Sequence, residues 1–167
     1  MALLAHLRTL RRDTRGSALV EFTLLAPLLI VLTAGLAEFG LALRQYHVME
    51  KGVRDAARYL NSVPVHPSCM GFTDTGTYTW SSAISDAQKL AIYGSTTGST
   101  PLFKSWSDVS TITVDDGTCQ PNPRVNGAPL GQITVTAAAP YADLGMLSFL
   151  GLGPITLTVS HQELKVV

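Results

Sequence analysis

The stretch "RRDTRGSALVEFTLLAPLLIVLTAGLAEFGLALR", Arg11 to Arg44, decides the fold. It opens with a basic segment that ends at Gly16, and the apolar run that follows contains its first acid at Glu21. The 16 residues between Glu21 and Glu38 carry no charge. Because an ionised carboxylate is costly to bury, a glutamate just inside an apolar segment needs a functional explanation.

The apolar run is long enough to cross a membrane. The 27 residues from Ser17 to Leu43 would form a helix of about 40 Å, against a hydrocarbon core of about 30 Å. Basic residues on one side of such a segment predict a cytoplasmic N-terminus, and here they are Arg8, Arg11, Arg12 and Arg15. We therefore expect a basic leader at 1–16 and a transmembrane helix at 17–43.

Two other interpretations fit the same run. It could be the core helix of a soluble protein, although little else in the chain could cover it. It could also be a secretory signal peptide, since Gly35–Ala37 offers small residues to a signal peptidase and Glu38 would follow the cut. Against the signal peptide, Glu21 would lie inside the apolar region, and the helical pattern continues past the cut.

Beyond Arg44 the pattern becomes amphipathic. Apolar residues recur at steps of three and four, while charged residues fall largely between them. The apolar positions are Tyr46, Met49, Val53, Ala56 or Ala57, and Leu60. This predicts an amphipathic helix at 44–63, which Pro64 ends. One helix should run from about Ser17 to about Ser62, with a kink near Pro27.

Residues 64–167 are rich in Thr, Ser and Gly and are expected to form an exported α+β domain. A short helix is predicted from Ser82 to Tyr93, with Ser81 or Ser82 as its cap. Three alternating segments predict strands: "DVSTITVDDG", ending at an Asp-Asp-Gly turn, "GQITVTAAAP" and "PITLTVSHQELKVV". In the expected fold, the long helix packs on a small antiparallel sheet of three to four strands.

The apolar segment "YADLGMLSFLGLG" lies between the last two predicted strands. We expect it to fold over the sheet as a cover for the core. The alternative is an exposed patch for a partner.

Cys69 and Cys119 lie about 50 residues apart, without the short spacing of a metal site. They could be free buried thiols. In an exported domain a disulfide is favoured, and closing this loop would stabilise the fold by about 4 kcal/mol in the chain-entropy model.

No pattern indicates an enzyme. The net charge is zero, which gives no overall basic field for nucleic acid. A single Asp-Thr-Gly-Thr string at Asp74 resembles the surroundings of an aspartic-protease acid, but such a site needs two carboxylates. The four histidines are scattered, and no nucleotide-binding or hydrolase motif occurs. We therefore expect no catalysis, no cofactor and no metal.

The string "RGSALVEF" resembles the processing site of type IV-like prepilins, in which a basic leader ends at Gly and Glu is the fifth mature residue. The longer stretch from Arg11 to Leu60 looks like the TadE-like family, pseudopilins of tight-adherence (Flp/Tad) pilus systems. The tail "ITVTAAAPYADLGMLSFLGLGPITLTVSHQELKV" is also similar to the late strands and connector of that family.

The resemblance implies that a prepilin peptidase cuts after Gly16 and makes Ser17 the new N-terminus. It also implies that Glu21 and Phe22 act in assembly, with the Glu21 carboxylate pairing with the α-ammonium of a neighbouring subunit. Such a pair fixes the axial register, because only one stagger brings the charges together. The alternative is a carboxylate that is solvated near the cytoplasmic headgroups.

The function expected from this resemblance is that of a membrane-anchored pseudopilin or minor pilin. It would lie in the bacterial inner membrane with a periplasmic C-terminal domain, and it could become extracellular on assembly. Its partners would be the prepilin peptidase and other pilins. The alternative is an exported binding domain on a permanent anchor.

Overall fold

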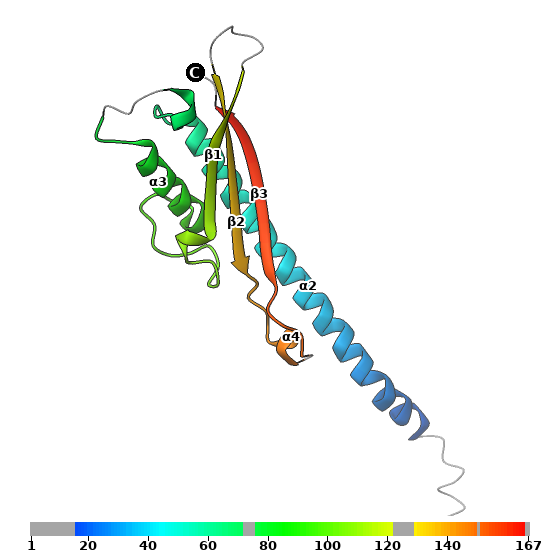
Figure 1. Cartoon of the computed structure of the whole chain (residues 1–167). Coiled ribbons are helices and arrows are strands. Elements are labelled where there is room, and N and C mark those ends of the chain that lie inside the picture. Colours follow the sequence, from blue (N-terminus) through cyan, green and yellow to red (C-terminus); the bar gives the residue numbers. More distant parts are fainter. Residues whose placement is uncertain (1–15, 72–75, 122–128, 150, 166–167) are drawn as a thin grey trace, which may run out of the picture. The chain divides into compact units, whose positions relative to one another are not determined.

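The computed structural model describes residues 16–71, 76–121, 129–149 and 151–165. Its elements are the helices α2 (Ser17–Ser62), α3 (Trp80–Tyr93) and α4 (Met146–Phe149), and the strands β1 (Ile112–Pro121), β2 (Pro129–Pro140) and β3 (Thr156–Lys165). Two short 3-10 helices, η2 (Ser68–Met70) and η3 (Val109–Thr111), complete it. The strands form one antiparallel sheet in the order β1-β2-β3 (Figure 1). The predicted α+β fold, a long N-terminal helix with a small antiparallel sheet, is confirmed.

The helix α2 has the predicted limits and continues through Pro27. The chain divides into two compact units, Met1–Gly40 and Leu41–Val167, and the boundary falls inside α2. The second unit contains α3, the sheet and the hydrophobic core.

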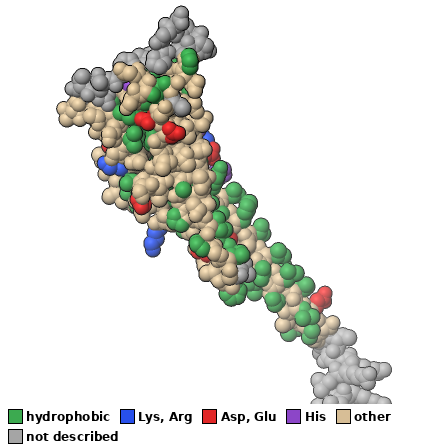
Figure 2. Space-filling model, in the orientation of Figure 1, with side chains coloured by type: hydrophobic (Ala, Val, Ile, Leu, Met, Phe, Trp, Pro, Cys, Tyr) green, Lys and Arg blue, Asp and Glu red, His purple; other side chains and the backbone are tan. Residues whose placement is uncertain are grey.

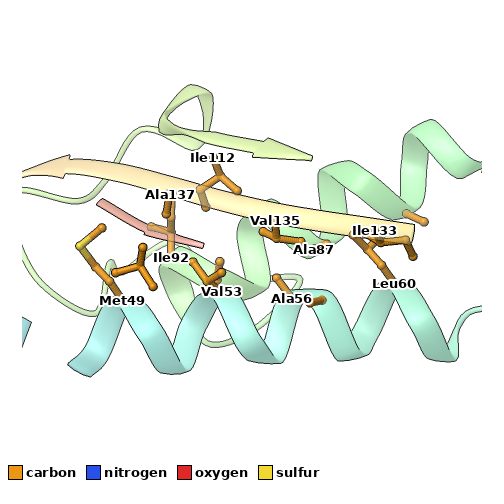
Figure 3. Packing of buried hydrophobic residues seen from close by; sticks show 14 of the residues in the cluster. Met49, Val53, Ala56, Leu60, Ala87, Ile92, Ile112, Ile133, Val135 and Ala137 are labelled. Atoms are coloured by element: carbon orange, nitrogen blue, oxygen red, sulfur yellow. The ribbon is translucent and has the colours of Figure 1, made fainter. Parts of the chain in front are cut away.

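The core forms where one face of α2 meets the sheet and α3 (Figure 3). The buried α2 residues include Met49, Val53, Ala56 and Leu60, at the spacing predicted for an amphipathic helix. From β2 come Ile133, Val135 and Ala137, which alternate along the strand as the sheet period requires. From α3 come Ala83, Ala87, Ala91 and Ile92. The small side chains of α3 allow it to approach α2 closely.

The prediction is wrong for one residue of the buried face of α2. Tyr46 is 39% exposed, and the buried side chain at this level is that of Gln45. The Gln45 amide donates to the Ala142 carbonyl at 2.8 Å and accepts from the Ala142 N–H at 3.0 Å. Because both halves of the amide are satisfied, a polar residue can occupy the buried position.

The helix α3 begins earlier than predicted. Its N-cap is Thr79, whose hydroxyl accepts from the Ser82 N–H, rather than Ser81 or Ser82. Trp80 is therefore the first helical residue, and it is buried. The helix ends as predicted at Tyr93, followed by Gly94 with φ 69°, the left-handed conformation that glycine adopts readily.

The strand β1 does not end at the predicted Asp-Asp-Gly turn. Asp115 pairs with Thr134 and Thr118 pairs with Gln132, so three steps along β1 correspond to two along β2. The extra residue is a β-bulge, after which the strand continues to Pro121. The Asp116 carboxylate accepts a hydrogen bond from the Trp80 indole N–H, which gives the bulge a tertiary partner.

The apolar segment between β2 and β3 does not cover the core. It contains the single-turn helix α4, and several of its large side chains are exposed: Leu144 at 64%, Phe149 at 82% and Leu152 at 55%. The prediction of core cover is wrong here. The face that the segment was expected to cover is occupied by α2 and α3 instead.

Candidate anchoring and assembly segment

The predicted cleavage site lies at the start of α2. Gly16 is exposed and directly precedes the first residue of the helix, Ser17. A Cβ added at Gly16 would meet no other atom within 4 Å. Packing within the described structure therefore gives no reason for a glycine at this position.

Glu21 lies one turn into α2 and is exposed, as is its neighbour Phe22 at 65%. No hydrogen bond or ion pair joins Glu21 to another residue in the part of the chain that the structure describes. Leu19 and Val20 before it are also exposed, at 71% and 60%. In water this carboxylate would be solvated, but within hydrocarbon it would need a partner.

The first unit exposes apolar side chains on every side of its helix. Consecutive residues of a helix point in different directions, and the five large residues from Leu28 to Leu32 are all between 51% and 65% exposed. Figure 2 shows the hydrophobic side chains gathered along this part of α2. An isolated helix that is apolar all round is typical of a membrane span.

Unlike Glu21, the two threonine hydroxyls of this segment are satisfied locally. The hydroxyl of Thr23 donates to the Leu19 carbonyl at 2.7 Å, and that of Thr33 donates to the Leu29 carbonyl at 2.8 Å. A lipid environment requires such internal partners, because it offers no hydrogen bonds. By length and composition, α2 is the one helix among the described residues able to span a membrane. An N-terminal apolar helix of this kind fits a membrane anchor.

The second part of α2 is different in character. Its core face is buried, while its outer face carries ion pairs such as Arg54–Glu50 at 2.6 Å and Lys51–Asp55 at 3.7 Å. These pairs are exposed and contribute little to stability. The Arg54 guanidinium donates to the Glu50 carboxylate on its own helix.

Cys69 in η2 and Cys119 in β1 form a disulfide, with their Cα atoms 5.7 Å apart. No free cysteine is present. The bridge ties the segment that follows α2 to the edge strand of the sheet. Sequence reasoning from spacing alone left free thiols open as an alternative.

Sequence reasoning missed Lys165, the last residue of β3. Its side chain is only 2% exposed, and its Nζ donates to the carbonyls of Leu60, Asn61 and Val63 at 2.9, 3.1 and 2.7 Å. These carbonyls belong to the end of α2 and the residue just after it, where a cation is favoured. The local alternation does place Lys165 on the inner face of β3, but a charge at such a position is ordinarily read as solvent-facing.

The remaining chemistry is sparse. In the described ranges no cluster of three or more His, Cys, Asp or Glu side chains could hold a metal ion. Asp74 lies outside the described residues, as do the four arginines of the basic leader.

Residues 16–58 match the family model described as TadE-like protein. The match begins at Gly16 and covers most of α2, and it confirms the TadE-like resemblance in this segment. The match indicates a Tad pilus-associated protein, and the TadE-like family is structural rather than catalytic. No curated protein and no solved structure matches the chain.

Proposed function

From the TadE-like match of residues 16–58, we propose that the chain is a membrane-anchored pseudopilin or minor pilin of a Tad pilus. In this proposal a prepilin peptidase removes residues 1–16, and residues 17–43 cross the inner membrane. Residues 44–63 continue the helix into the periplasm, where residues 64–167 form the exported domain. Packing of the apolar helices then assembles the subunit with other pilins into the pilus or its initiating complex.

The observation that carries the proposal is the unpartnered Glu21 within an apolar helix surface. Large apolar residues flank the carboxylate, and the structure assigns it no partner among the described residues. Cleavage after Gly16 would create an α-ammonium on Ser17, four residues from Glu21. In the proposal, the Glu21 carboxylate pairs with this α-ammonium on a neighbouring subunit.

Gly16 supports the same proposal. A residue that no packing contact requires to be glycine is suited to recognition by a peptidase, since it has no Cβ to obstruct access to the backbone. Gly16 also directly precedes α2, whose first N–H groups have no partner within the helix.

The proposal is tested by Glu21→Ala in cells that carry the pilus system. The variant should insert and be cut to the mature mass, but it should fail to co-purify with other pilins. Removing one partner of a buried ion pair costs about 3–5 kcal/mol, because the other charge is left uncompensated. Glu21→Asp should assemble at an intermediate level, since its shorter side chain displaces the charge.

Glu50→Ala is the matched control, an acid on the same helix beyond the apolar section. It loses only surface contacts, with Arg54 and with His47, and should assemble normally. Immunoblots report the mature mass, and pull-downs report the partners. Normal assembly of correctly processed Glu21→Ala would contradict the proposal and favour a permanently anchored binding domain.

A further inference from the structure

The connection between β2 and β3 forms a compact, apolar tip on the sheet. Pro140 pairs with Thr156 at the end of the hairpin, and the Tyr141 N–H donates to the Ile155 carbonyl at 2.8 Å. We call the described residues beyond this point, 141–149 and 151–155, the tip loop. Figure 1 shows α4, which belongs to it, beyond the arrowhead of β2.

The position of the tip loop along α2 is fixed by two contacts within the second unit. At one end of the hairpin, Lys165 bonds to the Leu60 carbonyl in the last turns of α2. At the other end, Ala142 exchanges two hydrogen bonds with Gln45. These α2 residues are 15 positions apart, about 22 Å along the helix. Gln45 lies two residues after Leu43, the last residue of the apolar segment of α2. The tip loop therefore lies at the end of the second unit that is next to this apolar segment.

The surface of the tip loop is apolar and nearly uncharged. Four of its large apolar side chains are exposed: Leu144 at 64%, Phe149 at 82%, Leu152 at 55% and Ile155 at 45%. Asp143 is its only charged residue. A shallow pocket of about 230 Å³ lies among its side chains. Soluble surfaces rarely gather large apolar side chains in this way without a binding role.

The backbone of the tip loop forms hydrogen bonds within the loop. The Phe149 N–H donates to the Gly145 carbonyl and the Gly151 N–H to the Ser148 carbonyl, both at 3.1 Å. The Leu152 N–H donates to the Leu147 carbonyl at 2.8 Å. The Ser148 hydroxyl donates to the Gly145 carbonyl at 2.9 Å. Internal satisfaction of polar groups lowers the cost of moving this segment out of water.

We infer that the tip loop inserts into the exported-side leaflet of the same bilayer that α2 crosses, as a second, interfacial membrane contact. The inference rests on the proposed function, because it requires α2 to be a membrane anchor. A lipid surface is the occupant that the geometry favours, since the loop is level with the point where α2 leaves the hydrocarbon. Exposed Arg44, beside Gln45, is placed to meet phosphate headgroups.

The consequence is a domain held by two contacts instead of one. A helix alone leaves the exported domain free to rotate about the helix axis. An apolar loop that penetrates about 5–10 Å into the interface would restrict that rotation and keep one face of the sheet toward neighbouring subunits.

Site-directed spin labelling of the full chain in lipid nanodiscs tests the inference. The discs contain phosphatidylethanolamine and phosphatidylglycerol and one copy of the protein. Because both native cysteines are in the disulfide, Phe149→Cys or Leu144→Cys supplies the only thiol. The label at either position should collide more often with apolar oxygen than with a water-soluble nickel complex. The matched control is Leu164→Cys, an exposed leucine (53%) beside Lys165 at the other end of the hairpin, where the nickel complex should dominate.

A label at Leu28→Cys separates the two proposals, since it should show the strongest preference for oxygen. If Leu28 is in lipid while both tip-loop labels are as accessible to nickel as Leu164, the inference is wrong and the anchor stands. That result is also the one expected of a surface that binds a protein partner, which the discs lack. If Leu28 itself is accessible to nickel, the membrane anchor fails, and the proposed function fails with it.

Discussion

At the scale of single residues, the two positions that matter most for the proposed function make few contacts within the described structure. Gly16 has no neighbour that requires it, and Glu21 has no partner among the described residues. Among the described residues, no contact gives either of them a role in the stability of the fold. In the proposed function both act toward other molecules, Gly16 toward the peptidase and Glu21 toward a neighbouring subunit.

Gly16→Val should block cleavage, since the branched side chain obstructs the backbone at the scissile bond. Mass spectrometry of the protein from pilus-competent cells should show a species heavier than wild type by residues 1–16. The N-terminus of the wild-type protein should be Ser17. An N-terminus at Glu38 would indicate a signal peptide, and normal processing of the valine variant would place the site elsewhere.

Lys165 should stabilise the second unit by satisfying the carbonyls at the end of α2. Lys165→Met keeps the apolar stem but removes all three donors, and it should lower the free energy of unfolding by about 1–3 kcal/mol. Urea unfolding of the full chain in detergent, followed by tryptophan fluorescence, measures the change. The Trp80 ring lies 5.8 Å from Nζ, so far-UV circular dichroism serves as an independent signal.

The same variant tests a pH effect. Burial lowers the pKa of Lys165 below its ordinary value of 10.5, so the folded chain releases this proton at a lower pH than the unfolded chain. Between the two pKa values the unfolded chain binds more protons, and this group makes the free energy of unfolding rise with pH. Lys165→Met should lack that contribution. Parallel stability curves for the two proteins up to pH 10.5 would show that the ammonium does not titrate differently in the folded state.

At the scale of elements, α2 is one helix with two different surfaces. Its apolar residues surround the helix from Leu19 to Phe39, whereas beyond Gln45 they follow a single buried stripe. The change of pattern coincides with the boundary between the two compact units. The first surface is suited to lipid and to other apolar helices, and the second is suited to a sheet and α3.

At Gly52, α2 lies close against α3. A Cβ at this position would lie 2.4 Å from the Ala91 carbonyl oxygen and 3.1 Å from the Trp106 ring. Gly52→Ala should therefore force the helices apart and destabilise the second unit by about 1–3 kcal/mol.

Gly40→Ala is the matched control on the same helix, since no atom lies within 4 Å of its added Cβ. It should leave stability unchanged or raise it by up to about 1 kcal/mol through helix propensity. Urea unfolding in detergent compares the two variants. Equal effects would mean that the α2–α3 contact is looser than the structure has it.

At the scale of the whole molecule, the chain after α2 is held by one covalent and several noncovalent ties. The disulfide joins η2 to β1, and Trp80 bonds to the Asp116 bulge on the same strand. Lys165 joins the last strand back to the end of α2. These ties connect the sheet to η2, to α3 and to the end of α2.

Removing the disulfide should weaken this unit. The double variant Cys69→Ser, Cys119→Ser should lose about 4 kcal/mol of stability if the entropy of the loop is the whole effect, and less if the reduced chain stays compact. Unfolding of the variant is compared with that of the wild type under oxidising conditions. Before this comparison, intact-mass analysis of wild type should show a gain of two hydrogens on reduction. Two thiols that react with an alkylating reagent without reduction would contradict the disulfide.

The sequence by itself determined the long helix, its limits, its two surfaces and the alternation of the strands. These features depend on local periodicity, on Pro64 as a helix stop and on the length of the apolar run. The part of the family resemblance that the match at 16–58 supports comes from the same local stretch.

Only the tertiary structure decided what depends on partners far along the chain. Gln45 replaces Tyr46 in the interior because Ala142, 97 residues away, satisfies its amide. Lys165 is buried because the end of α2 accepts its hydrogen bonds. The Asp-Asp-Gly turn becomes a bulge within β1, and the apolar segment between β2 and β3 stays exposed because α2 and α3 already fill the core. Periodicity reports which side chains are apolar, but the free energy of burying a polar group depends on the partner that the fold brings to it.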